Sequence, residues 1–256
     1  MKYKRIDIYY FSGTGNTFLV INKIADVLRS KGFNVNLMKI EKKPEVLLED
    51  NLLIGLAFPV HLQSTNKFVW DFFYNLPNVY SMNIDVFMAD TMASFSGGIV
   101  GPLKMVLKNK GYNCIGAKEF RMPSNYTKQN FDKNRLIIEK SLEEAENFAI
   151  DLINGKIKWR RAPIFSDFMR LFSKFDLLWK VFRKIISVDN NKCSKCGICA
   201  KICPVGAISY SQEGFPIITD KCIICVRCVN YCPSNAFMIS KKHIPQYKPV
   251  ELKHWF

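Results

Sequence analysis

The chain has 256 residues, which is enough for one substantial domain and a second, small one. Its first residues lack the apolar stretch of a signal peptide, and no run of eighteen apolar residues occurs anywhere. We therefore expect a cytoplasmic protein rather than a secreted or membrane-spanning one. The formal net charge is +15, and the segment 155–188 contributes strongly to it, with nine basic against two acidic side chains.

Strand and helix patterns alternate over residues 1–155, which is typical of a parallel sheet covered by helices on both faces. Residues 52–58 are almost all apolar, as expected for a strand buried on both sides. The other expected strands cover residues 5–11, 33–40, 83–89 and 112–120, and the expected helices cover residues 17–31, 66–75, 101–110 and 134–153. Five strands with intervening helices predict a three-layer α/β sandwich.

A turn rich in Gly and hydroxyl side chains follows the first expected strand. Glycines allow a sharp turn, and backbone N–H groups at a helix N-terminus form an anion cradle. The lysine of a Walker loop is missing. A dinucleotide fingerprint would need Gly or Ala in place of Phe18 and an acidic residue after the second strand, where Glu41 is only loosely placed. The pattern favours a phosphate site formed by Ser12, Gly13, Thr14, Gly15, Asn16 and Thr17.

Two later loops strengthen this interpretation. Residues 58–65 and 90–98 follow the third and fourth expected strands, and both contain small and polar residues, with two glycines at the end of the second loop. With the turn, they resemble the flavin site of flavodoxins. The resemblance implies a flavodoxin-like three-layer sandwich with a five-stranded parallel sheet in the order 2-1-3-4-5, and FMN as cofactor. The flavin ring would then lie at Phe58, Pro59, Val60, His61, Thr91, Ser94, Phe95, Ser96, Gly97 and Gly98.

Neither loop has the Trp or Tyr that stacks on the ring in many flavodoxins, and Phe58, His61 and Phe95 are the available substitutes. We expect His61 in a solvated loop, with a flavin-side group that titrates near neutrality as the alternative. Cys114 is expected to be a small buried residue of the fifth strand, with a redox role as the alternative.

The basic segment 156–188 follows this domain. Apolar side chains recur there every three or four residues, which predicts an amphipathic connector helix of about six turns. We expect this helix to pack between two domains. The alternatives are a docking surface for acidic partners or anionic membrane and a coiled-coil dimer, and a nucleic-acid site is disfavoured. The apolar seam consists of Phe165, Phe168, Phe172, Phe175, Trp179, Phe182 and Ile186.

Eight of the nine cysteines form two runs with the same C-x2-C-x2-C-x3-C-P spacing, 29 residues apart. Three closely spaced thiolates with one displaced thiolate suit an iron–sulfur cube better than a tetrahedral zinc ion. A disulfide framework would need an oxidising compartment, to which nothing in the sequence directs the chain. The runs are Cys193, Cys196, Cys199 and Cys203 before Pro204, and Cys222, Cys225, Cys228 and Cys232 before Pro233.

Residues 189–240 therefore resemble a bacterial ferredoxin with two [4Fe-4S] clusters, a small α+β domain that is followed by a tail at 241–256. The resemblance implies crossed ligation, with Cys193, Cys196, Cys199 and Cys232 at one cluster and Cys222, Cys225, Cys228 and Cys203 at the other. Gly197 lies between the second and third ligands of the first run, where the second run has Val226 and Arg227. Because hydrogen bonding and charge then differ, we expect the two potentials to differ.

The whole chain resembles a flavodoxin–ferredoxin fusion. This implies an electron-transfer protein that passes low-potential electrons between two [4Fe-4S] clusters and FMN, and so interconverts one- and two-electron transfer. Expected partners are redox proteins, such as an acidic ferredoxin, a flavodoxin or a low-potential oxidoreductase, and not nucleic acid. The alternative is an FMN-dependent reductase of a small quinone-like acceptor that receives electrons from its own ferredoxin domain.

Overall fold

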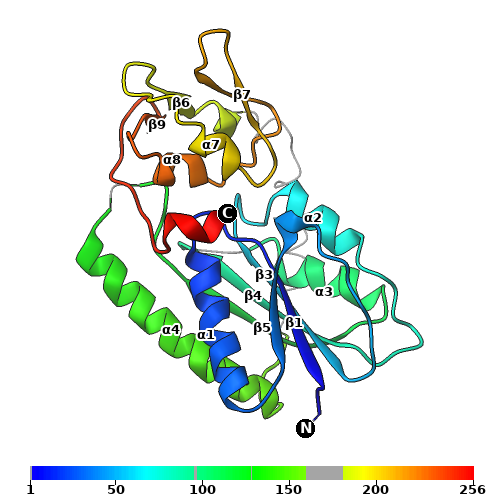
Figure 1. Ribbon diagram of the computed structural model, residues 1–256. Helices are drawn as coiled ribbons and strands as arrows, with labels where there is room; N and C mark the ends of the chain where they lie inside the picture. Colours follow the sequence, from blue (N-terminus) through cyan, green and yellow to red (C-terminus); the bar gives the residue numbers. More distant parts are fainter. Residues whose placement is uncertain (1, 95–96, 128, 160–180) are drawn as a thin grey trace. The chain divides into compact units, whose positions relative to one another are not determined.

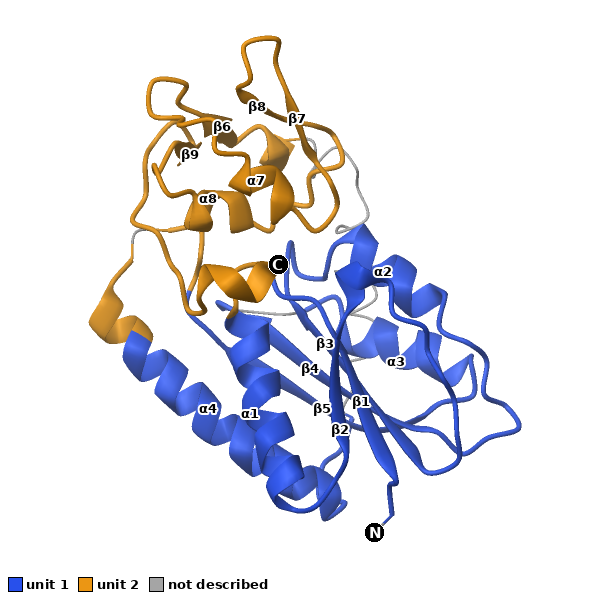
Figure 2. Cartoon of the chain, viewed as in Figure 1, with its two compact units in different colours: residues 1–12, 16–123, 135–174 blue, residues 13–15, 124–134, 175–256 orange. Residues whose placement is uncertain are grey.

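The computed structural model describes residues 2–94, 97–127, 129–159 and 181–256. The chain divides into two compact units, which we describe separately (Figure 2). The first unit comprises residues 1–12, 16–123 and 135–174, and the second comprises residues 13–15, 124–134 and 175–256. The segments of the two units alternate along the chain. The expected domain boundaries after residues 155, 188 and 240 therefore stay predictions.

A five-stranded parallel sheet forms the centre of the first unit, with the strand order β2-β1-β3-β4-β5. Ile8 pairs with both Leu37 and Gly55, and Phe58 pairs with Asp90. This strand order is that of flavodoxin-like folds, so the expected fold class is confirmed. The strands are β1 (Arg5–Tyr10), β2 (Val35–Lys39), β3 (Leu52–Pro59), β4 (Asp85–Met92) and β5 (Asn113–Arg121).

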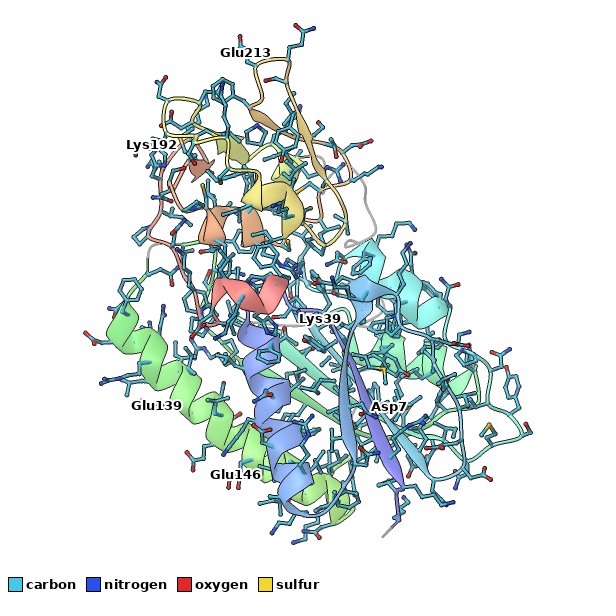
Figure 3. The ribbon with its side chains drawn as sticks, in the orientation of Figure 1. Asp7, Lys39, Glu139, Glu146, Lys192 and Glu213 are labelled. Carbon is cyan, nitrogen blue, oxygen red and sulfur yellow. The ribbon has the colours of Figure 1, made fainter. Side chains whose placement is uncertain are left out.

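Helices cover both faces of this sheet. α1 and α4 lie on one face, and α2 and α3 lie on the other (Figure 1). Glu139 and Glu146 of α4 point away from the sheet, on the solvated side of the helix (Figure 3). The helices are α1 (Asn16–Ser30), α2 (Lys67–Tyr74), α3 (Val100–Lys108) and α4 (Phe131–Ile153), with the short 3-10 helix η1 (Ile40–Lys42) after β2.

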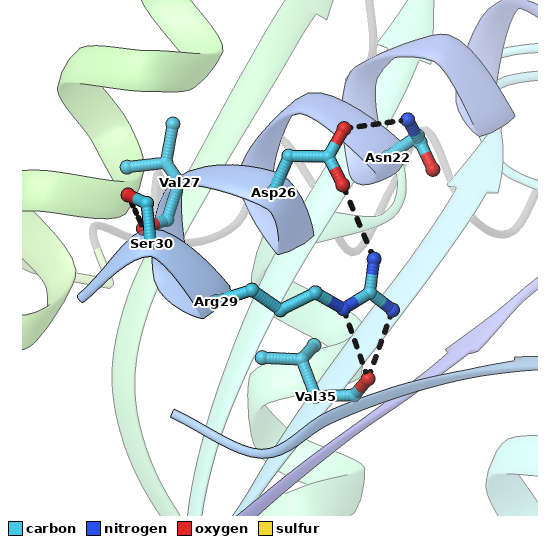
Figure 4. A network of polar contacts seen from close by, with 6 residues as sticks. All are labelled: Asn22, Asp26, Val27, Arg29, Ser30 and Val35. Carbon is cyan, nitrogen blue, oxygen red and sulfur yellow. Dashed lines mark hydrogen bonds and ion pairs between the residues drawn. The ribbon is translucent and has the colours of Figure 1, made fainter. Parts of the chain in front are cut away.

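Local hydrogen bonds fix the helix ends. Asn66 caps α2, because its side chain accepts a hydrogen bond from the N–H of Val69 at 3.2 Å. Near the end of α1, Arg29 donates to the Asp26 carboxylate at 3.2 Å and to the Val35 carbonyl at 2.9 Å (Figure 4). This network joins the last turn of α1 to the first residue of β2.

The core between the sheet and α4 is built from aromatic rings. Phe87 of β4 and Phe120 of β5 both pack on Phe148 of α4, with ring centroids 5.9 and 5.7 Å apart. Gly55 of β3 makes room for Phe87, because a Cβ atom at Gly55 would lie 2.5 Å from that ring. The unbroken apolar run of β3 is therefore buried along almost its whole length, as expected.

In its described residues, the second unit has two antiparallel strand pairs and the short helices α7 and α8. β6 (Ile186–Val188) pairs with β9 (Phe237–Ile239), and β7 (Ile208–Tyr210) pairs with β8 (Pro216–Ile218). The helices are α7 (Ile198–Lys201) and α8 (Arg227–Tyr231), and the chain ends in the 3-10 helix η2 (Leu252–Trp255). The C-terminal residues pack against this unit.

Most of the expected connector helix lies outside the described residues, since Phe165, Phe168, Phe172, Phe175 and Trp179 fall within residues 160–180. Its expected C-terminal end is wrong. Ile186 begins strand β6 and pairs with Ile239, a partner that helical spacing does not reveal. Within the described part of the chain, no helix is both long and apolar enough to cross a membrane.

Candidate functional site

Two cavities in the second unit are lined by cysteines. Both cavities are partly open to solvent. The first is lined by Cys193, Cys196, Cys199 and Cys232, and the second by Cys203, Cys222, Cys225 and Cys228. The structure thus gathers the cysteines into the two sets that crossed ligation requires.

The four cysteines of each set line one cavity. Among residues 2–94, 97–127, 129–159 and 181–256, no three His, Cys, Asp or Glu side chains are arranged as ligands of a single metal ion. A four-iron cube differs from a single ion because it takes one thiolate at each of four separate irons. The cavities therefore fit clusters of this kind through their donor sets, since each is lined by four thiols.

Both short helices begin after a residue in the left-handed conformation. Gly197 precedes α7 with φ 74°, and Val226 precedes α8 with φ 51°. This conformation favours Gly and is strained for a β-branched residue such as Val. The two cysteine runs thus keep the same backbone turn although their sequences differ there.

Backbone N–H groups donate to sulfur at equivalent places in the two runs. The N–H of Ala207 donates to Cys203 Sγ at 3.2 Å, and the N–H of Ala236 donates to Cys232 Sγ at 3.3 Å. Hydrogen bonds of this type stabilise thiolate sulfur and tune the potential of a bound cluster. Each cavity therefore has such a donor in a matching position, and the second cavity has a further one, because the N–H of Ile224 donates to Cys222 Sγ at 3.4 Å.

Burial disfavours the thiolate form of these cysteines. It raises the pKa of Cys199 to about 11 and the pKa of Cys225 to about 12. The charge and the backbone N–H of Arg227 act in the opposite direction and lower the pKa of Cys225. Without bound metal these two thiols are protonated at neutral pH, so cluster insertion releases their protons.

The expected phosphate turn is mostly buried, and the side chains of Ser12, Asn16 and Thr17 have partners within the first unit. The N–H of Phe18 donates to Ser12 Oγ at 3.4 Å, and the Asn16 amide donates to the Pro123 carbonyl at 2.9 Å. The Thr17 hydroxyl lies 2.8 Å from the hydroxyl of Thr91. Because a hydroxyl both donates and accepts, these contacts leave capacity for a ligand oxygen.

The middle of this turn belongs to the second unit. Arg227 Nε donates to the Gly13 carbonyl at 3.1 Å, and the Tyr231 hydroxyl donates to the Thr14 carbonyl at 2.9 Å. The trans peptide is planar, so the N–H groups of Thr14 and Gly15 point away from those carbonyls. Gly15 has φ 128°, which suits only Gly. The turn therefore has a glycine where its backbone conformation requires one.

The two loops expected beside a flavin ring are linked to each other, because the N–H of Val60 donates to the Thr91 carbonyl at 2.8 Å. Phe58 is fully buried and packs edge-on against Phe73, with ring centroids 5.1 Å apart. Its ring belongs to the core, so the expectation that it substitutes as a stacking ring is wrong. Pro59 ends β3, Ser94 is exposed, Gly97 and Gly98 are buried, and Phe95 and Ser96 lie outside the described residues.

His61 is buried, so its expected solvated position is wrong. Its backbone exchanges hydrogen bonds with Ser64 at 2.8 and 3.0 Å, across a turn in which Leu62 and Gln63 have positive φ. Burial lowers the pKa of His61 to about 4. The imidazole is therefore neutral at pH 7, which disfavours the alternative of titration near neutrality.

Two buried polar groups near His61 in the sequence were missed. Gln63 Oε1 and Asn66 Nδ2 have no hydrogen-bond partner among the described residues. A buried polar atom without a partner costs about 1–3 kcal/mol. Gln63 Oε1 can accept a hydrogen bond from an N–H group of a flavin ring, and Asn66 Nδ2 can donate one to a ring carbonyl. Gln and Asn are common in loops, so no sequence signal distinguishes them.

Cys114 of β5 is half-buried rather than fully buried. Its Sγ lies 3.9 Å from the Lys104 carbonyl, and burial raises the pKa of the thiol to about 11. A thiol that stays protonated is a poor nucleophile, which favours the expected packing role.

Comparisons with known proteins identify the cysteine-rich segment. Residues 192–237 match the family of 4Fe-4S dicluster domains. An uncharacterized polyferredoxin-like protein of Methanocaldococcus jannaschii is 41% identical over 49 residues, which cover 19% of this chain. The matched stretch spans only 29% of the length of that relative.

Solved flavodoxins are similar to part of the chain. The two-electron reduced flavodoxin of Megasphaera elsdenii is 19% identical with a TM-score of 0.42, and the match covers 56% of this chain and 97% of that one. Oxidised Flavodoxin 2 from Bacillus cereus is 17% identical with a TM-score of 0.43, over 59% of this chain and 98% of that one. Because both TM-scores are below 0.5, the fold assignment rests on the strand order of the sheet.

The chain thus combines a flavodoxin-like sheet with a segment that matches the family of 4Fe-4S dicluster domains. This organisation resembles that of a flavodoxin–ferredoxin fusion.

Proposed function

We propose that the protein transfers electrons through two [4Fe-4S] clusters and FMN. The observation that carries this proposal is the pair of cavities in the second unit, each lined by three cysteines of one run and one of the other. Two complete sets of four thiols support two clusters of the bacterial type. The eight cysteines of these sets would be the ligands.

FMN would use the polar turn after β1 and the loops after β3 and β4. Ser12, Thr14 and Thr17 offer buried hydroxyls to the phosphate, and the Gln63 and Asn66 amides offer unpaired groups to the ring. FMN exchanges one or two electrons, whereas each cluster exchanges one. A chain that holds both interconverts one- and two-electron transfer.

The partners would be other redox proteins. The formal charge of +15 falls to about +9 once two clusters and a flavin phosphate are bound, and it still favours acidic partners such as ferredoxins or flavodoxins. None of the nine cysteines forms a disulfide bond in this structure. A reducing compartment keeps them so, and we therefore propose a cytoplasmic protein.

Iron, acid-labile sulfide and flavin content per chain test this proposal, on protein purified without oxygen. About eight irons, eight sulfides and one FMN are expected, with an absorption spectrum that bleaches on adding dithionite. Eight irons without flavin, even after FMN is added, would refute the flavin half. Multiple turnovers with a quinone and a defined KM would instead favour the reductase.

A further inference from the structure

Arg227 is among the largest fully buried side chains of the protein, with 2% of its surface exposed. It is the first residue of α8, between Cys225 and Cys228, and it lines the second cavity together with four cysteines. An arginine is almost never buried this deeply without a structural or functional reason. Its guanidinium keeps its positive charge under all physiological conditions.

The contacts of Arg227 hold the guanidinium in one place. Nη1 donates to the Ile202 carbonyl at 2.8 Å, and Nε donates to the Gly13 carbonyl at 3.1 Å, both in the same unit. The guanidinium carbon lies 3.9 Å from the centre of the Trp255 ring, in η2. The C-terminal turn therefore covers a fixed positive charge beside the second cavity, and water screens such a charge only weakly.

The first cavity has no equivalent of this charge in the matching position. The residue 29 positions before Arg227 is Ile198, which is apolar. A cation does line the first cavity, but it is Lys195, an exposed residue whose ammonium lies over the Phe215 ring at 4.2 Å. Water and salt screen an exposed ammonium far more than a buried guanidinium. The two cavities thus differ in electrostatics although their cysteines match.

We propose that Arg227 raises the reduction potential of the cluster in the second cavity above that of the cluster in the first. Reduction adds one electron to a four-thiolate cluster and changes its net charge from about −2 to −3. A nearby buried cation stabilises the more negative, reduced form. The first electron therefore goes to the second cavity. This inference rests on the proposed function, because it needs both clusters.

An anaerobic potentiometric titration of the loaded full-length protein tests this, with dithionite as the electron donor and electron paramagnetic resonance as the readout. The unmodified protein should show two separate one-electron steps. Cys196→Ser replaces the exposed ligand of the first set by an oxygen ligand, so it should alter the step at lower potential and leave the upper step unchanged. The opposite assignment, or two coincident steps, would overturn the proposal.

Arg227→Gln removes the charge but keeps an amide donor for one of the two carbonyls. At the midpoint potential of the upper step in the unmodified protein, Arg227→Gln should lower the ratio of reduced to oxidised cluster in the second cavity about tenfold. Arg227→Lys should retain most of the potential, and Lys195→Gln, the matched control at the first cavity, should shift neither step appreciably. Equal shifts of both steps in Arg227→Gln, or no shift, would contradict the proposal.

Iron and sulfide are counted in every sample before titration. Fewer than eight irons in the unmodified protein would mean that the proposed function fails, whereas eight irons with the wrong order of potentials would mean that only this inference fails. If Arg227→Gln does not retain its clusters, the titration of the unmodified protein and Cys196→Ser still decides the order of the two cavities.

Discussion

The hydroxyl oxygens of Thr17 and Thr91 lie 2.8 Å apart and join the start of α1 to the end of β4 in the first unit. Both side chains are buried, so each hydroxyl depends on the other for a hydrogen bond. The pair connects the turn expected to bind phosphate with the loop expected to contact the flavin ring.

Thr17→Val should lower the free energy of unfolding by about 1–3 kcal/mol, because it leaves the buried Thr91 hydroxyl without this partner. The double variant Thr17→Val/Thr91→Val should cost less than the sum of the two single variants. Chemical denaturation of all four proteins, without added flavin, measures this coupling. Strict additivity would show that the contact does not contribute.

Thr14→Val with Thr17→Val should weaken FMN binding far more than riboflavin binding, because only FMN has the phosphate that these hydroxyls would contact. Fluorescence titration of both ligands gives the two dissociation constants. Thr65→Val is the matched control, since Thr65 is also buried but donates to the Pro59 carbonyl. Equal weakening of both ligands would place the phosphate elsewhere.

Pairs of cysteine substitutions test the crossed sets. Cys196 and Cys232 line the same cavity. The double variant Cys196→Ala/Cys232→Ala should therefore lose no more than about four irons per chain. Combining Cys232→Ala with Cys225→Ala affects both cavities and should remove about eight. Cys114→Ala should remove none. If Cys232 and Cys225 behave as ligands of one cluster, the crossing is wrong.

His61 should make the protein less stable as the pH falls below 6.5. Its pKa is about 4 when folded and near 6.5 when unfolded, so the unfolded chain binds the proton first. Between pH 7 and pH 5 this coupling should remove about 2 kcal/mol of stability. In His61→Gln, the free energy of unfolding should fall between pH 7 and pH 5 by about 2 kcal/mol less than in the unmodified protein. Chemical denaturation of both proteins at both pH values measures this difference. An equal loss in both proteins would show that His61 is not buried as a neutral group.

Gly55→Ala should destabilise the first unit by about 1–3 kcal/mol, because the added Cβ would overlap the Phe87 ring. Adding Phe87→Leu should restore part of the loss by vacating that space. Thermal unfolding of the two variants checks this. A double variant less stable than Gly55→Ala alone would argue against direct packing of these two residues.

The sheet was predictable because its signals are local. The apolar run of β3 and the alternation of elements depend on burial that each segment shows by itself. Ile186 was misassigned because its strand forms only through Ile239, far along the chain. The periodic apolar residues before it gave no indication of that pairing.

The cysteine sets were predictable because their spacing fixes the ligand geometry. The environment of His61 was not, because a turn with Leu62 and Gln63 at positive φ lacks the Gly or Asn that normally reveals it. Arg227 was visible in the sequence, but its burial depends on Trp255, which lies 28 residues later. Such contacts come from tertiary packing, and spacing alone does not encode them.

The exchange of one cysteine between the two cavities also bears on how such a segment could arise. A single run of four cysteines would leave any cavity that it forms one ligand short, because its fourth cysteine serves the neighbouring cavity. Two separate copies would have to dimerise before either cluster was complete. Tandem duplication within one polypeptide makes the pairing of the two runs intramolecular. Cluster assembly then depends on the length of the chain that links the two runs, and no longer on the protein concentration.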